Sequence, residues 1–186
     1  MRLSKRILRL SLITASLLLV PLVAMQFTQE VKWTLSDFVF AGVLLFGTGL
    51  AYELIARPES PTAYRVASGV ALATALFLVW SNLAVGIIGS EDNPANLLYG
   101  GVLVVGVVGA ILARLRPQRM VRAMLATALA QFLVPVVALL IWQPALTWGV
   151  AGVLGANVFF VVLWVVSALL FRRASTTGSA STPQFA

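Results

Sequence analysis

The chain contains no histidine and no cysteine, and only 10% of its 186 residues are charged. Soluble domains carry about 25% charged residues, so this chain lacks the polar surface that a water-soluble enzyme needs. Without cysteine and histidine it has no thiol nucleophile, no disulfide and no imidazole base, and it lacks the usual ligands of zinc, iron–sulfur and haem sites. We therefore predict a non-enzymatic protein with no catalytic residue, no cofactor and no metal site.

Apolar residues make up 60% of the chain and gather in six long runs. A helix that crosses the ~30 Å hydrocarbon core of a bilayer needs about 20 apolar residues, whereas a barrel strand needs about 10 that alternate in polarity. The runs fit helices, which pair their own backbone polar groups in lipid. They predict an all-α polytopic transmembrane helix bundle over residues 1–171, with helices at about 7–25, 37–56, 64–89, 94–113, 121–142 and 148–171.

Basic residues alternate between the segments that connect these runs. One set of alternate segments holds 12 of the 13 Lys and Arg residues, and the other set holds only Lys32. Cytoplasmic segments are the ones that carry this excess, so both termini are predicted to lie in the cytoplasm, with Tyr99 at the outer interface. The net charge of +7 then reflects membrane orientation, and no nucleic-acid partner is expected.

The two ends of the chain differ in character. The basic start, the apolar stretch and the small residues near Ala24 also describe a signal peptide. Leu22-Val-Ala24 is a poor cleavage site, so we favour an uncleaved first helix, and cleavage would leave five helices. Residues 172–186 are mostly small and polar, which predicts a disordered cytoplasmic tail.

Glycines form stripes on two of the predicted helices. At 100° per residue, Gly42 and Gly49 share a face with Glu53, and Gly106 and Gly109 share a face of the fourth run. Small residues let membrane helices approach closely. We therefore predict that Gly42, Gly49, Gly106 and Gly109 lie at helix–helix contacts.

Three amides fall at membrane depth, at Asn82, Gln131 and Asn157. The first two lie on small-residue faces, which places them inside the bundle, and Asn157 lies on a different side from the glycines of its helix. We expect these amides to hydrogen-bond neighbouring helices. The alternative is a polar path or a ligand site near the bilayer centre.

Glu53 is the one acidic residue well within a run, and Arg57 follows it at i+4. This spacing predicts a local ion pair at the inner end of the helix. The alternative is a proton or cation site, because intramembrane carboxylates often mark ion pathways.

The most polar connection contains Glu91, Asp92 and Asn93, just before a predicted helix. Acidic residues favour the positive end of a helix dipole, and asparagine can cap it. One short loop supplies too few oxygens for a divalent cation unless another chain contributes some, so these residues are predicted to stabilise the helix start.

Three stretches carry a resemblance, namely Val31–Phe38, Leu45–Leu54 and Asn82–Leu97. They resemble a family of small, uncharacterised bacterial multi-pass inner-membrane proteins, over roughly residues 21–140. The resemblance implies a location in the bacterial cytoplasmic membrane and a multi-helix bundle, and it implies no ligand and no functional residue.

Two functions are compatible with these features. The first is a membrane-embedded accessory or scaffold protein, which fits the short loops and the lack of reactive groups. The alternative is a small oligomeric transporter or channel for an ion or small solute, which would use Glu53 and the buried amides. The expected partners are the lipid bilayer and either a larger membrane complex or further copies of the chain.

Overall fold

The computed structural model describes residues 2–90, 92–142 and 148–179, and their regular structure is entirely helical. Six stretches within them are long and apolar enough to cross a membrane. This confirms the predicted all-α class and indicates a multi-pass membrane protein. The helices are α1 (Arg2–Phe27), α2 (Leu35–Ile55), α3 (Thr62–Ala84), α4 (Leu97–Ala113), α5 (Pro117–Trp142) and α6 (Trp148–Ser179), with the short 3₁₀ helix η1 (Pro94–Asn96) directly before α4.

Several helix ends differ from the predicted ones, and the ends of α3 and α6 show why. α3 stops at Ala84 rather than at residue 89, because Gly86 and Gly89 adopt positive φ angles of 66° and 75° that a right-handed helix does not contain. α6 continues to Ser179, so residues 172–179 are helical where the sequence predicted a disordered tail. Ala174 is only 2% exposed and packs in the core, which explains why the helix does not end at the arginines. Residues 180–186 lie outside the described residues.

The chain forms two compact units, which divide after Leu54. The first unit is a hairpin of α1 and α2. Leu18 of α1 lies beside Gly42 of α2, and Leu10 lies beside Gly49. The two helices are therefore antiparallel.

The start of α2 is fixed by a reciprocal cap. The Asp37 carboxylate accepts hydrogen bonds from the backbone N–H of Thr34 at 2.7 Å and from its hydroxyl at 2.8 Å. The Thr34 hydroxyl in turn accepts from the Asp37 N–H at 3.4 Å. Such a capping box satisfies donors that the first helical turn would otherwise leave unpaired.

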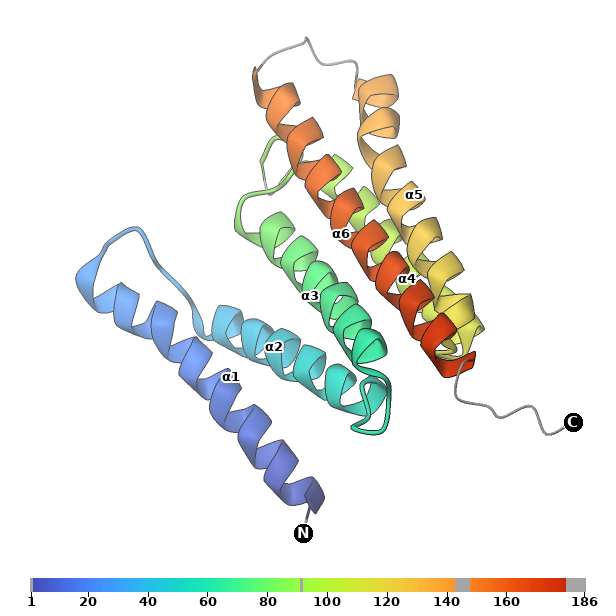
Figure 1. Cartoon of the computed structure of the whole chain (residues 1–186). Helices are drawn as coiled ribbons and strands as arrows, with labels where there is room; N and C mark the ends of the chain where they lie inside the picture. Colours follow the sequence, from blue (N-terminus) through green and yellow to red (C-terminus); the bar gives the residue numbers. More distant parts are fainter. Residues whose placement is uncertain (1, 91, 143–147, 180–186) are drawn as a thin grey trace, which may run out of the picture. The chain divides into compact units, whose positions relative to one another are not determined.

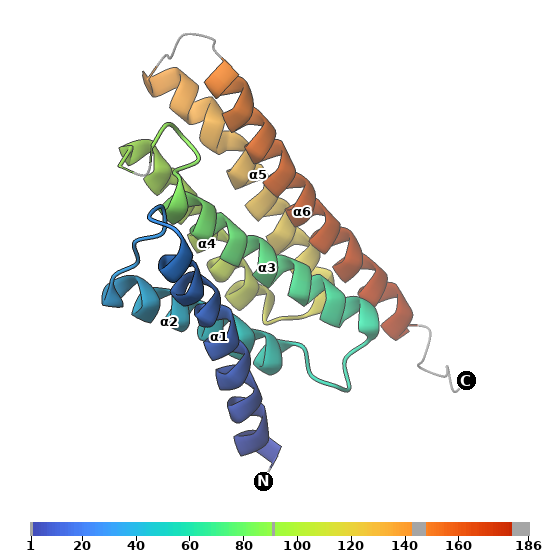
Figure 2. The same ribbon diagram turned by 90° about the vertical axis from the view of Figure 1, so that its left-hand side faces the viewer.

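The second unit contains α3 to α6, which run alternately in opposite directions (Figures 1 and 2). α6 packs between α3 and α5, and α5 packs between α6 and α4. α3 and α4 make little contact although they are consecutive in the chain. The Ser167 hydroxyl donates to the Ala67 carbonyl at 3.0 Å and so links α6 to α3.

Two apolar clusters fill this unit, one toward each end. The larger is built around Tyr64, Met124, Trp164 and Phe171, and the smaller contains Leu78, Tyr99, Val102, Val134 and Phe160. All these side chains are at most 7% exposed.

All the basic residues of this unit gather at the end with the larger cluster. The Tyr64 hydroxyl at the start of α3 donates to the Leu115 carbonyl in the α4–α5 turn at 2.8 Å, and so joins two basic segments. α6 also ends there (Figure 1). The arginines are exposed, and they are Arg57, Arg65, Arg114, Arg116, Arg119, Arg122, Arg172 and Arg173.

Candidate functional site between the helices

A buried polar cluster joins three helices of the second unit. Gln131 of α5 donates from Nε2 to Oδ1 of Asn157 on α6 at 2.9 Å. Asn157 donates from Nδ2 to the Tyr99 hydroxyl of α4 at 2.8 Å, and to the Val153 carbonyl of its own helix at 2.9 Å. The three side chains are at most 2% exposed. We call Tyr99, Gln131 and Asn157 the polar cluster.

Gln131 retains hydrogen-bond capacity that the cluster does not use. Its Oε1 is buried and has no partner among the described residues. Pro135 lies four residues further along α5 and has no N–H, so the Gln131 carbonyl cannot receive the usual helical hydrogen bond from that position. The side-chain Oε1 of Gln131 therefore has no donor among the described residues, and its backbone carbonyl lacks the N–H that residue 135 of a regular helix would supply.

Tyr99 is the member of the cluster that the sequence did not reveal. Its predicted depth at the outer interface stays a prediction, and the structure shows that its ring is 2% exposed and that its hydroxyl accepts from Asn157. A tyrosine near the end of an apolar run looks the same in sequence whether it faces lipid headgroups or the bundle. Only the packing of α4 against α5 and α6 distinguishes the two.

Asn82 does not join this cluster. Its Nδ2 donates to the Leu78 carbonyl of its own helix at 2.8 Å, and its Oδ1 has no partner among the described residues. The expected bond to a neighbouring helix is therefore wrong for Asn82. Its side chain is half-buried near the end of α3, where that helix has little contact with α4.

Glu53 pairs with α1 rather than with Arg57. Its carboxylate forms a salt bridge to Arg6 at 3.7 Å and a second one to Arg9. The predicted pair with Arg57 is wrong because α2 ends at Ile55, so residues 53 and 57 are not on successive turns of one helix. Glu53 thus continues the stripe of Gly42 and Gly49 along α1.

The predicted packing glycines lie at two helix contacts. An added Cβ at Gly49 would be 2.9 Å from Leu10, and at Gly42 it would be 3.4 Å from Leu18. On α4, an added Cβ at Gly109 would be 3.0 Å from Cβ of Ala123 on α5, and at Gly106 it would be 3.5 Å from Thr127. All four glycines therefore allow close approach of a neighbouring side chain.

The polar connection before α4 is held by two asparagines. Asn93 caps η1 by accepting from the Ala95 N–H at 3.0 Å. Asn96, which the sequence analysis missed, accepts from the Ile88 N–H at 2.9 Å and donates to the Ser90 carbonyl at 2.7 Å. Asp92 is exposed, Glu91 lies outside the described residues, and the role predicted for their charges stays a prediction. No group of three acidic side chains that could hold a metal ion occurs in the described part of the chain.

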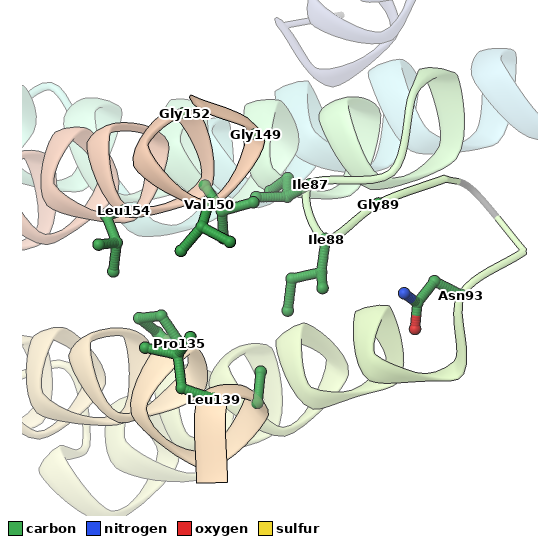
Figure 3. A pocket seen from close by; sticks show the side chains of 12 residues that line it. Ile87, Ile88, Gly89, Asn93, Pro135, Leu139, Gly149, Val150, Gly152 and Leu154 are labelled. Carbon is green, nitrogen blue, oxygen red and sulfur yellow. The ribbon is translucent and has the colours of Figure 1, made fainter. Parts of the chain in front are cut away.

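A pocket of about 480 Å³ opens between α5, α6 and the Ile87–Gly89 segment. Figure 3 shows Val150 and Leu154 of α6 facing Pro135 and Leu139 of α5, with Ile88 beside them. The lining residues are mostly apolar and none is charged: they are Ile87, Ile88, Gly89, Asn93, Pro135, Ala138, Leu139, Gly149, Val150, Gly152, Val153 and Leu154.

Comparisons with protein-family models, with curated proteins and with solved structures found no match. The resemblance to bacterial inner-membrane proteins therefore stays a prediction.

Proposed function

We propose that the chain is a non-enzymatic, multi-pass protein of the bacterial cytoplasmic membrane that serves as an accessory or scaffold subunit of a larger membrane assembly. Both termini lie in the cytoplasm in this proposal. The orientation is supported by the eight arginines at one end of the α3–α6 unit, because basic residues collect on the cytoplasmic side.

The observation that carries the proposal is that the buried polar side chains hydrogen-bond one another. Asn157 and Gln131 could contact a solute in a transporter. Here they hydrogen-bond each other, and Asn157 also donates to Tyr99, so the bonds join three helices. Interhelical hydrogen bonds of this kind hold membrane helices together. A chain whose membrane-embedded polar groups chiefly join its own helices suits a structural role.

The alternative is a small oligomeric transporter or channel. It would require Glu53 as a proton or cation site. The Glu53 carboxylate instead forms salt bridges with Arg6 and Arg9. A vacant cation site would need an unpaired carboxylate, so the ion pairs favour the accessory function.

Two measurements test the proposal. The tagged full-length chain, extracted in mild detergent, should co-purify with a membrane protein in a fixed ratio. The purified chain in proteoliposomes should give no proton or cation flux above empty vesicles. A flux that Glu53→Gln abolishes without lowering thermal stability would instead establish the transporter.

A further inference from the structure

We propose that Arg119 and Arg122, on the outer side of the α4–α5 contact, bind the phosphate of an anionic phospholipid whose acyl chains lie along exposed apolar side chains of the two helices. This goes beyond the accessory function and does not depend on it, because it requires only that the helices span a membrane. The lipid belongs to whichever leaflet this end of the unit faces.

Arg122 lies on a face of α5 that contacts neither α4 nor α6. Gln131 marks the α6 side of the helix, because it donates to Asn157, and it points about 180° away from Arg122 at 100° per residue. Ala123 marks the α4 side, because it lies beside Gly109, and it is about 100° from Arg122 round the helix. Arg122 is exposed, so its side chain points outward from the α3–α6 unit.

The depth of Arg122 follows from the register of α4 against α5. Gly109 of α4 lies beside Ala123 of α5, and the two helices are antiparallel. Leu112 therefore lies about 2–3 Å nearer the α4–α5 turn than Arg122 does, and it is 71% exposed. An arginine that starts deeper than an exposed leucine is within the apolar zone of the membrane, where an uncompensated charge is costly.

The described part of the chain supplies no counter-charge for this arginine. Neither Arg119 nor Arg122 forms a salt bridge with a described residue, and the sequence contains no acidic residue after Asp92. At the arginine-rich end of the second unit, Glu59 is the one carboxylate among the described residues, beside eight arginines. The compensating anion therefore comes from outside the chain.

The two guanidinium groups select the headgroup. Arg119 and Arg122 are neighbours on the helix surface, at i and i+3, and the Arg122 side chain leans toward the amino end of α5, where Arg119 lies. Like charges at this spacing repel each other, and a phosphate between them accepts charge-assisted hydrogen bonds from both. A zwitterionic headgroup would bring an ammonium that the nearby Arg116 repels, so the lipid is anionic.

The surrounding side chains select a lipid over a free phosphate. Leu129 and Leu133 lie within about 20° of Arg122 round α5, and both are exposed. On α4, Val105 is exposed on the same face as Leu112. The phosphate of a phospholipid stays at the edge of this apolar surface while its acyl chains cover the surface, whereas a free phosphate would have to leave water to reach it.

The test compares dioleoyl phosphatidylglycerol with dioleoyl phosphatidylcholine, which share their acyl chains and differ in headgroup charge. Each lipid is added to the full-length protein in a neutral detergent, and the unfolding temperature is measured. We expect phosphatidylglycerol at about five times its Kd to raise Tm by about 2–4 °C, and phosphatidylcholine to raise it less. Equal shifts with the two lipids, or no shift with either, would overturn the proposal. Inorganic phosphate should give no shift, and a shift as large as that of phosphatidylglycerol would show a site for free anions and overturn the assignment to a lipid.

Two exposed arginines at the same end of the unit provide matched variants. Arg122→Gln and Arg172→Gln each remove one positive charge, but Arg172 belongs to α6, on the opposite side of α5 from Arg122. Without lipid, both variants should melt near the wild type, because both side chains are exposed. Arg122→Gln should weaken phosphatidylglycerol binding by about tenfold, and Arg172→Gln by about twofold at most. Equal weakening by the two variants would show attraction to the charge of the whole end and would overturn the site.

Discussion

Asn157 uses both ends of its amide, accepting from Gln131 and donating to Tyr99 and to the Val153 carbonyl. Because the side chain is 2% exposed, water cannot replace a lost bond. The amide therefore fixes the relative rotation of α4, α5 and α6 at one depth.

Replacing Asn157 with leucine should leave the Gln131 amide and the Tyr99 hydroxyl without their hydrogen-bond partner in an apolar environment. Single membrane hydrogen bonds average ~0.6 kcal/mol, and stranded buried polar groups cost about 1–3 kcal/mol. We expect Asn157→Leu to lower the free energy of unfolding in detergent by about 1–3 kcal/mol. Val158→Leu, at a 58% exposed neighbour, is the control and should change little. Equal stability of both variants would contradict the structural role of the cluster.

The Glu53 carboxylate interacts with arginines that are 43% and 63% exposed. Exposed ion pairs contribute at most about 1 kcal/mol. In a double-mutant cycle, Glu53→Gln and Arg9→Gln should show a coupling energy of about 0.5–1 kcal/mol that falls in high salt. The same cycle with Arg57→Gln serves as the control and should be additive. A coupling energy between Glu53 and Arg57, with none between Glu53 and Arg9, would instead support the local ion pair that the sequence predicted.

At the scale of the helices, close approach depends on glycines that face a neighbour. The α4–α5 contact in the second unit is close, since Cβ of Ala123 lies 3.0 Å from the position that a Cβ would take at Gly109. Gly101, on the same helix, has open space at its Cβ position. The chain therefore contains its own control for a packing test.

Gly109→Leu should force α4 away from α5 and lower the free energy of unfolding by about 1–3 kcal/mol, the usual cost of overpacking. Thermal melting of the detergent-solubilised protein measures this. Gly101→Leu should melt within a degree or two of the wild type. If both variants melt alike, α4 and α5 do not pack through this face.

The connection between α3 and α4 is held by hydrogen bonds of the Asn96 side chain. Asn96→Ala removes the acceptor of the Ile88 N–H and both amide bonds to the Ile88 and Ser90 carbonyls. We expect faster amide exchange at Ile88, measured by hydrogen–deuterium exchange, with exchange in the middle of α5 unchanged. Unchanged protection at Ile88 would show that Asn96 does not hold this segment.

At the scale of the whole molecule, the charge distribution and the helix directions give one orientation in the proposal. Reporter fusions after Ala186 and within residues 26–35 should lie on opposite sides of the membrane, with the carboxyl terminus inside. This expectation follows from the alternation of 12 of 13 basic residues. A carboxyl terminus outside would overturn both the orientation and the helix count.

Apolar run length and residue content were sufficient to determine the helical class from the sequence. Runs of about 20 apolar residues predicted six helices, and the structure contains them, because a helix pairs its own backbone groups whatever its neighbours are. Helix ends were harder. The end of α3 depends on the positive φ of Gly86, and the extension of α6 depends on the burial of Ala174.

Only the tertiary structure decided which polar groups meet. Glu53 reaches Arg6 and Arg9, 44 or more residues away in sequence, rather than Arg57. Tyr99 and Asn157 meet across 58 residues. Helical periodicity shows which face a residue occupies and not which helix lies against that face. The partners of a membrane-embedded side chain therefore follow from the packing of helices, whereas the existence of those helices follows from the sequence alone.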